Sequence, residues 1–129
     1  MKKFALTMLA VTFVFGLSLN TARAIAPFKK EFDELYVKDS KNEAFVAAAK
    51  KANCLICHGK NAEGKEDKKV RNAYGKALDK LLDKKDDAKN VEKIRAALET
   101  VAKEKSNPDD ASSPTFGELL SEGKLPSDK

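Results

Sequence analysis

The chain of 129 residues lacks most of the side chains from which metal and catalytic sites are built. It has no tryptophan, one histidine, two cysteines and two methionines. A structural zinc site takes four ligands, and the two cysteines and one histidine supply only three. No acid–base constellation stands out among the charged residues of this short chain. These absences argue against a dedicated enzyme.

No apolar run reaches the roughly 20 residues that a membrane-spanning helix needs. The N-terminus has instead the pattern of a secretory signal peptide: two lysines, the apolar stretch Phe4–Leu19 and the small-x-small sequence Ala22–Ala24. A retained membrane anchor is the alternative, but the short apolar run and the cleavage pattern favour removal. We therefore expect a signal peptide at residues 1–24 and a single domain at residues 25–129. This domain is expected in the periplasm or an equivalent extracytoplasmic compartment, without stable membrane insertion.

No basic cluster interleaved with aromatic residues is present, so nucleic-acid binding has no support. The whole chain has 25 basic and 20 acidic residues, a formal net charge of +5. Three basic residues and no acidic ones belong to the predicted signal peptide, so the 22 that remain leave a net charge of +2. The basic character of the chain therefore belongs largely to the segment that is removed.

Both cysteines and the only histidine stand together in Cys54-Leu55-Ile56-Cys57-His58. The C-x-x-C-H pattern is typical of covalent attachment of c-type haem. Two thiols add to the two vinyl groups of the porphyrin, and the adjacent imidazole reaches the iron from the proximal face. We therefore predict one haem c, with Cys54 and Cys57 as covalent anchors and His58 as the proximal iron ligand.

Three other interpretations of this cluster are open. A C-x-x-C pair can be a thioredoxin-like redox site, which requires a βαβ context. It can be half of a zinc site, or an ordinary disulfide of an exported protein with His58 as a bystander. The signal peptide favours haem, because haem c is assembled outside the cytoplasm.

Helical periodicity dominates the rest of the chain, and no period-2 alternation indicates a strand. The first helix is expected to start at Pro27 and to break near Asp39-Ser40. The expected helices carry these apolar positions: Phe28, Phe32, Leu35 and Tyr36; Phe45, Val46, Ala48, Ala49 and Ala52; Val70, Tyr74, Ala77, Leu78, Leu81 and Leu82; Val91, Ile94, Leu98 and Val101; Leu119 and Leu120.

Capping boxes predict where two of these helices open. One is Ser40–Glu43, before the helix that leads directly into Cys54, and the other is Thr115–Glu118, before the last helix. Gly59–Lys69 is expected to be an exposed polar loop, and the tail from Pro126 to be frayed. The prediction is an all-α fold whose limited core is completed by a buried porphyrin, and we expect the chain to fold poorly without it.

Together these features resemble the single-haem c-type cytochromes, specifically the small helical class I type. The resemblance implies a cytochrome c-like domain of about four to five helices around one covalently bound haem. More weakly, the chain is similar to small exported cytochromes of planctomycete- and anammox-type bacteria, through Arg71–Gly75, Pro114–Leu120 and Gly123–Pro126. Some of those relatives form heterodimers with a His/Cys-ligated haem, but this chain has no third cysteine to carry that ligation over.

The distal side of the iron has no evident ligand. Class I cytochromes generally use a methionine there, and the only methionines, Met1 and Met8, belong to the predicted signal peptide. The sixth site is then open or water-filled, or takes a lysine, Tyr74, the new α-amino group of Ile25 or a ligand from a partner subunit. Tyr74 is also a candidate haem-pocket residue, although a packed core position is the more ordinary role for such an aromatic.

Two functions follow from this residue set. The first is electron carriage between periplasmic redox proteins by an exported monohaem cytochrome, alone or as a dimer with a second copy or another small cytochrome. The second is binding of NO, CO or a similar small ligand at an open haem, for sensing or scavenging. A peroxidase would need a distal histidine or another positioned proton donor, and no second histidine exists. The expectation is an electron carrier that is not an enzyme.

Overall fold

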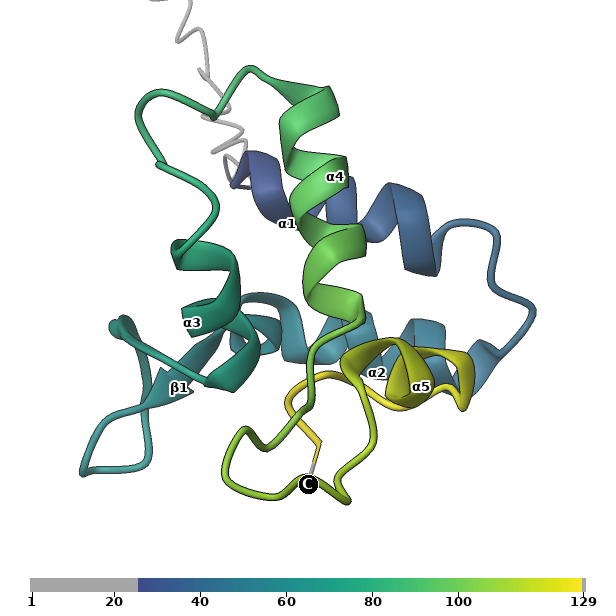
Figure 1. Ribbon diagram of the computed structural model, residues 1–129. Coiled ribbons are helices and arrows are strands. Elements are labelled where there is room, and N and C mark those ends of the chain that lie inside the picture. Colours follow the sequence, from purple (N-terminus) through teal and green to yellow (C-terminus); the bar gives the residue numbers. More distant parts are fainter. Residues whose placement is uncertain (1–25, 129) are drawn as a thin grey trace, which may run out of the picture.

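The computed structural model describes residues 26–128, and these residues form five α-helices, two short helices of other types and one two-stranded sheet (Figure 1). The predicted signal peptide lies outside the described residues. The elements in chain order are α1 (Pro27–Phe32), the π-helix η1 (Asp33–Val37), α2 (Glu43–Ala52), the 3-10 helix η2 (Asn53–Ile56), β1 (His58–Lys60), β2 (Glu66–Arg71), α3 (Ala73–Asp79), α4 (Val91–Ala102) and α5 (Phe116–Ser121). None of the helices in this part of the chain is long and apolar enough to cross a bilayer.

The first helix starts at Pro27, as predicted, because proline has no N–H to leave unpaired at a helix start. Its hydrogen-bond pattern widens after Phe32, and the chain continues as the π-helix η1 to Val37. A turn follows, with the Ser40 N–H donating to the Val37 carbonyl at 3.2 Å. The predicted break near Asp39-Ser40 is therefore confirmed.

The start of α2 differs from the prediction. Its N-cap is Asn42, whose side chain accepts a hydrogen bond from the Phe45 N–H at 3.0 Å, so the proposed capping box at Ser40–Glu43 is wrong. The helix ends at Ala52, and Asn53 has a φ of +47°, a left-handed conformation that asparagine tolerates better than most residues. The chain therefore turns before Cys54 and does not run straight into it.

A β-hairpin forms where an exposed loop was predicted, so the fold is about half helical and not plainly all-α. Strands β1 and β2 pair antiparallel, with an irregularity between His58 and Gly59. At the turn, the Asn61 side chain accepts hydrogen bonds from the Glu63 and Lys65 N–H groups. Gly64 supplies the left-handed residue, with a φ of +78°. Most side chains of β2 are exposed, so no alternation of apolar and polar residues marked the strand.

The predicted position of the third helix was partly wrong, whereas that of the fourth helix was correct. Helix α3 begins at Ala73 and not at Val70, which belongs to β2 and is exposed. Helix α4 matches its prediction, and Ile94 and Leu98 are fully buried on its inner face. Val91 was expected on that face, but it is 43% exposed.

The last helix is opened by the predicted capping box. The Thr115 hydroxyl accepts from the Glu118 N–H at 3.1 Å, and the Glu118 carboxylate accepts from the Thr115 N–H at 2.6 Å. The tail is not frayed as far as Asp128, because Leu125 and Pro126 are buried and the Leu125 N–H donates to the Asp128 carboxylate. The expectation of a loose tail from Pro126 was therefore wrong for residues 126–128.

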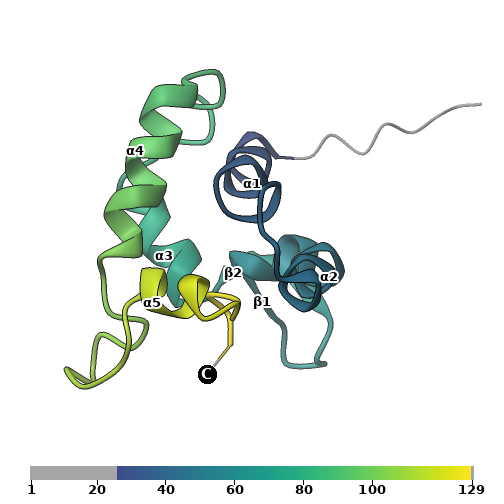
Figure 2. The same ribbon diagram turned by 90° about the vertical axis from the view of Figure 1, so that its right-hand side faces the viewer.

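Three aromatic rings join α1, α3 and α5 in the core. The Tyr74 ring packs edge-on against Phe32 at a centroid distance of 6.0 Å and against Phe116 at 5.0 Å. Such edge-to-face pairs add about 0.5–1.5 kcal/mol each beyond burial. In Figure 2, α1 and α2 lie on one side of the molecule and α3 and α4 on the other, with α5 at the end of α4. The C-x-x-C-H motif follows α2, opposite the start of α3.

Candidate functional site

The two cysteines lie at the ends of one short turn. Cys54 belongs to η2, and the Cys57 N–H donates to the Cys54 carbonyl at 3.2 Å. In a 3-10 helix, side chains at i and i+3 lie nearly above one another. Both thiols are partly buried, and neither takes part in a disulfide. The turn therefore brings the two cysteines close together, as attachment along one porphyrin edge requires.

His58 is the first residue of β1, and its ring is held from β2. Nδ1 lies 3.3 Å from the Val70 carbonyl oxygen. A carbonyl can only accept, so Nδ1 carries a hydrogen, and in the neutral imidazole Nε2 then carries the lone pair. Histidines that bind metals commonly donate their other ring N–H to a backbone carbonyl, which fixes the tautomer and the ring orientation. This arrangement leaves Nε2 as the nitrogen that is able to bind a metal.

The surroundings of the thiols do not favour a reactive redox dithiol. Burial raises the pKa of the Cys57 thiol to about 12. Burial first, and then the neighbouring Glu66 carboxylate, raise the pKa of the Cys54 thiol. Redox cysteines of the thioredoxin type need the opposite change, because the thiolate is the nucleophile. The motif also leads into a β-hairpin and not a βαβ unit, so both observations count against the thioredoxin-like interpretation.

Tyr74 lies on the first turn of α3, the helix that packs against the motif. Its side chain is fully buried, and burial raises the pKa of its phenol. Its hydroxyl has no hydrogen-bond partner among the described residues. A buried hydroxyl without a partner is costly, and such groups call for an explanation. Tyr74 is therefore a core residue, which is the more ordinary role of such an aromatic. Its hydroxyl, close to the motif, is free to form a hydrogen bond.

The residue after Tyr74 sets the distance between α3 and the motif. A Cβ atom on Gly75 would lie 1.9 Å from the Cys57 carbonyl oxygen. No side chain other than glycine's fits there without a backbone movement. The first turn of α3 is therefore packed directly against the backbone of the C-x-x-C-H turn.

The donor set fits haem c better than zinc. Among residues 26–128, no group of three or more histidine, cysteine, aspartate or glutamate side chains is placed to hold a metal ion. The two thiols at i and i+3 and the oriented imidazole match what covalent haem requires on its attachment edge and proximal side. Cys54, Cys57 and His58 therefore fit haem c on its attachment edge and proximal side. No residue is assigned to the distal side of the iron.

Lysine was one of the options for the distal side, and Lys29 is the lysine whose charge acts on both thiols. It comes from α1, its side chain is 13% exposed, and its ammonium group pairs with the Asp33 carboxylate one turn along the helix. Binding to iron would require Lys29 to leave that pair and to lose its proton. Ile25, whose α-amino group was another option, lies outside the described residues.

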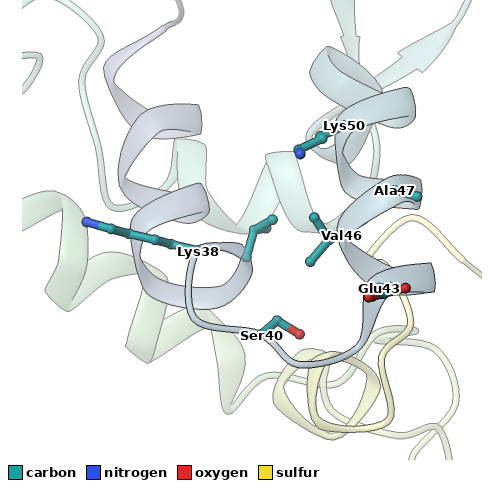
Figure 3. A pocket seen from close by; sticks show the side chains of 7 residues that line it. Lys38, Ser40, Glu43, Val46, Ala47 and Lys50 are labelled. Atoms are coloured by element: carbon teal, nitrogen blue, oxygen red, sulfur yellow. The ribbon is translucent and has the colours of Figure 1, made fainter.

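A groove of about 480 Å³ lies between the end of η1 and one face of α2 (Figure 3). Val46 and Lys50 point from α2 toward η1 in this view. The groove is lined by Val37, Lys38, Ser40, Glu43, Val46, Ala47 and Lys50. None of the four predicted site residues lines it, although Lys50 is about one helical turn before Cys54. The groove and the C-x-x-C-H motif are therefore separate features.

Two contributors to the site were not predicted as functional residues. The Val70 carbonyl acts through the backbone, so its residue type carries no signal for it. Asn72 stands in the segment Arg71–Gly75, but it was not singled out there. Its side chain caps α3 and also contacts the motif backbone. Only the pairing of β1 with β2 brings these residues next to His58.

Comparison with known proteins adds no family assignment. A scan against protein-family models, a search of curated proteins and a search of solved structures each found no match to this chain. The residues of the site and their geometry are therefore the basis for inferring what the protein does.

Proposed function

We propose that the chain is an exported c-type cytochrome with one covalent haem, which carries single electrons between redox partners outside the cytoplasm. The observation that carries the proposal is the contact between His58 Nδ1 and the Val70 carbonyl, one residue after the turn that bears both thiols. It supports a metal-binding imidazole at the one position that the C-x-x-C-H pattern requires.

In this proposal the motif residues have distinct roles. Each thiol of Cys54 and Cys57 adds across one vinyl group: a carbon–sulfur bond forms, and the thiol hydrogen goes to the other vinyl carbon. His58 binds through Nε2, while the Val70 carbonyl keeps the imidazole in one orientation and increases its basicity. Bound haem supplies a one-electron couple. The Ile56 side chain, between the two cysteines, is buried in the hydrophobic core.

Covalent attachment is tested by exporting the full chain in cells that express haem-maturation factors. We expect a haem-stained band on a denaturing gel, and a mass increase of one haem. The Cys54→Ala/Cys57→Ala double variant should lose both signals, whereas Ala48→Ser, on α2 before the motif, should keep them. An unstained wild-type protein that is exported and soluble would overturn the proposal.

Binding of a small ligand such as NO or CO is the second candidate function. It is favoured by the residue count, because residues 25–129 contain no methionine, no second histidine and no third cysteine. An optical spectrum of the reduced protein with and without CO separates the two functions. A low-spin spectrum that CO leaves unchanged supports the electron carrier and excludes an open site. Immediate conversion to a CO complex supports the ligand-binding function and counts against a simple carrier.

A further inference from the structure

We propose that Asn72 is the positioning residue of the haem-attachment turn, which it holds through hydrogen bonds to consecutive backbone carbonyls. The inference rests on the proposed function, because the turn attaches haem only if that function is correct. The contacts themselves belong to the chain alone and can be measured whether or not haem is present.

One residue makes its closest contacts with three successive carbonyl groups of the motif. The Asn72 side-chain amide, through Nδ2, donates to the Leu55 carbonyl at 3.1 Å and to the Ile56 carbonyl at 2.9 Å. The backbone N–H of Asn72 donates to the Cys57 carbonyl at 3.1 Å. These contacts join residues that lie 15 to 17 positions apart in the chain. They hold the backbone at the two residues between the cysteines and at Cys57 itself.

The orientation of this amide is determined by its partners. Its oxygen faces the Gly75 N–H at 2.9 Å, and its nitrogen faces two carbonyl oxygens. An amide nitrogen has two hydrogens, one for each carbonyl. Reversing the amide would place an oxygen against two acceptors, so only one assignment satisfies all three contacts.

The same short segment also holds the imidazole. Val70 accepts from His58 Nδ1, and Asn72, two residues later, binds the carbonyls before His58. Nδ2 also lies 3.4 Å from the His58 carbonyl. A shift of Asn72 therefore moves both the backbone of the turn and the acceptor that orients the ring. This coupling makes Asn72 a positioning residue for the iron ligand, beyond its role as the α3 N-cap.

The capping role and the positioning role can be separated by substitution. Serine is about as good an N-cap as asparagine, but it lacks the two-hydrogen amide. Asn72→Ser therefore keeps the cap of α3 and removes the donor to Leu55 and Ile56. Asn72→Asp keeps the size and the cap, and places an acceptor opposite both carbonyls. Asn90→Ser is the matched control, because Asn90 caps α4 by accepting from the Lys93 N–H at 3.0 Å.

The test measures amide hydrogen exchange in the exported, haem-bearing protein and its variants. We expect the amides of residues 55–58 to exchange about tenfold faster in Asn72→Ser than in wild type, relative to those of α4. Asn72→Asp should accelerate them further, and Asn90→Ser should leave them unchanged. The electron paramagnetic resonance spectrum of the oxidised protein should change from one species to several in the Asn72 variants alone.

Each contrary result has a distinct meaning. Exchange in the turn that matches the Asn90→Ser control would overturn the inference. So would an equal acceleration in the turn and in α4, since that would show a role in global stability only. If wild type has no covalent haem, the proposed function fails. The exchange comparison on the haem-free chain then still decides whether Asn72 holds the turn.

Discussion

Arg95 on α4 forms an ion pair with Glu31 on α1, with 2.7 Å between Nε of the arginine and Oε2 of the glutamate. The glutamate side chain is 5% exposed and the arginine 45% exposed. A buried carboxylate is costly unless it is paired and hydrogen-bonded. This contact therefore fixes how the first helix lies on the fourth, and with it the position of the Phe32 ring next to Tyr74.

Removing the charge of Arg95 should destabilise the protein. Arg95→Met keeps the aliphatic stem but leaves the Glu31 carboxylate without its partner, so we expect the free energy of unfolding to fall by about 1–3 kcal/mol. Urea denaturation at pH 7 measures it. Lys124→Met, which breaks the exposed pair with Glu122, should leave the unfolding midpoint unchanged. Equal midpoints for both variants would contradict a stabilising role for the buried pair.

Adding one methyl group at Gly75 should disturb the site. In Gly75→Ala the new Cβ meets the Cys57 carbonyl, which belongs to the backbone and cannot rotate away. We expect a loss of about 1–3 kcal/mol in the free energy of unfolding, although alanine is the better helix former.

Gly59→Ala is the comparison for that change, because its Cβ meets a methyl group of Val70, which is a side chain that can adjust. It should cost less than Gly75→Ala in the same urea experiment. A smaller loss for Gly75→Ala than for Gly59→Ala would show that α3 does not pack on the turn as described.

Removing the Tyr74 hydroxyl should not destabilise the chain by itself. In Tyr74→Phe the ring contacts with Phe32 and Phe116 remain, and an oxygen without a partner among the described residues is lost. The free energy of unfolding should stay the same or rise by about 1 kcal/mol. A clear decrease, measured by urea denaturation of protein exported with haem-maturation factors, would mean that the hydroxyl has a partner that the described residues do not supply.

Asp87 should contribute to the loss of stability in acid. The Lys93 ammonium group, and then the Asp83 N–H, hold the pKa of the Asp87 carboxyl below its ordinary value of 3.8. Its contribution is therefore complete above that ordinary value, and it is lost as the pH falls through the lowered folded-state pKa. Asp87→Asn should make the urea midpoint fall less steeply between about pH 5 and pH 2.

Asp86→Asn is the control for this pH dependence. Among the described residues, the Asp86 side chain accepts no hydrogen bond and forms no ion pair. Its midpoint should follow the wild-type curve more closely than that of Asp87→Asn. Identical acid slopes for wild type and Asp87→Asn would contradict the assignment.

Local features of the chain were predicted well. The spacing of Ile94 and Leu98 placed the inner face of α4, because a helix of this length presents its apolar residues at a fixed period. The capping box at Thr115 was correct, because both of its hydrogen bonds connect residues three positions apart. These interactions depend on few other parts of the molecule.

The hairpin was missed because its strands carry little apolar alternation. Charged side chains fill β2, and the pairing with β1 is made by backbone groups that the sequence does not distinguish. The sequence signal for the hairpin turn was the pair Asn61 and Gly64. The Asn61 side chain accepts a hydrogen bond within the turn, and Gly64 takes the left-handed conformation. Helix α3 begins later than predicted for the same reason, since Val70 belongs to β2 and Asn72 is the residue that caps the helix.

The sequence by itself determined that Cys54, Cys57 and His58 lie together, because five consecutive residues cannot be separated by folding. It also determined that residues 25–129 contain no methionine. Only the tertiary structure decided which groups orient the C-x-x-C-H motif. The Val70 carbonyl is 12 residues from the imidazole and the Asn72 amide is 16 residues from the Ile56 carbonyl. Contacts over such separations depend on strand register and on the close approach of α3, which the order of residues alone does not reveal.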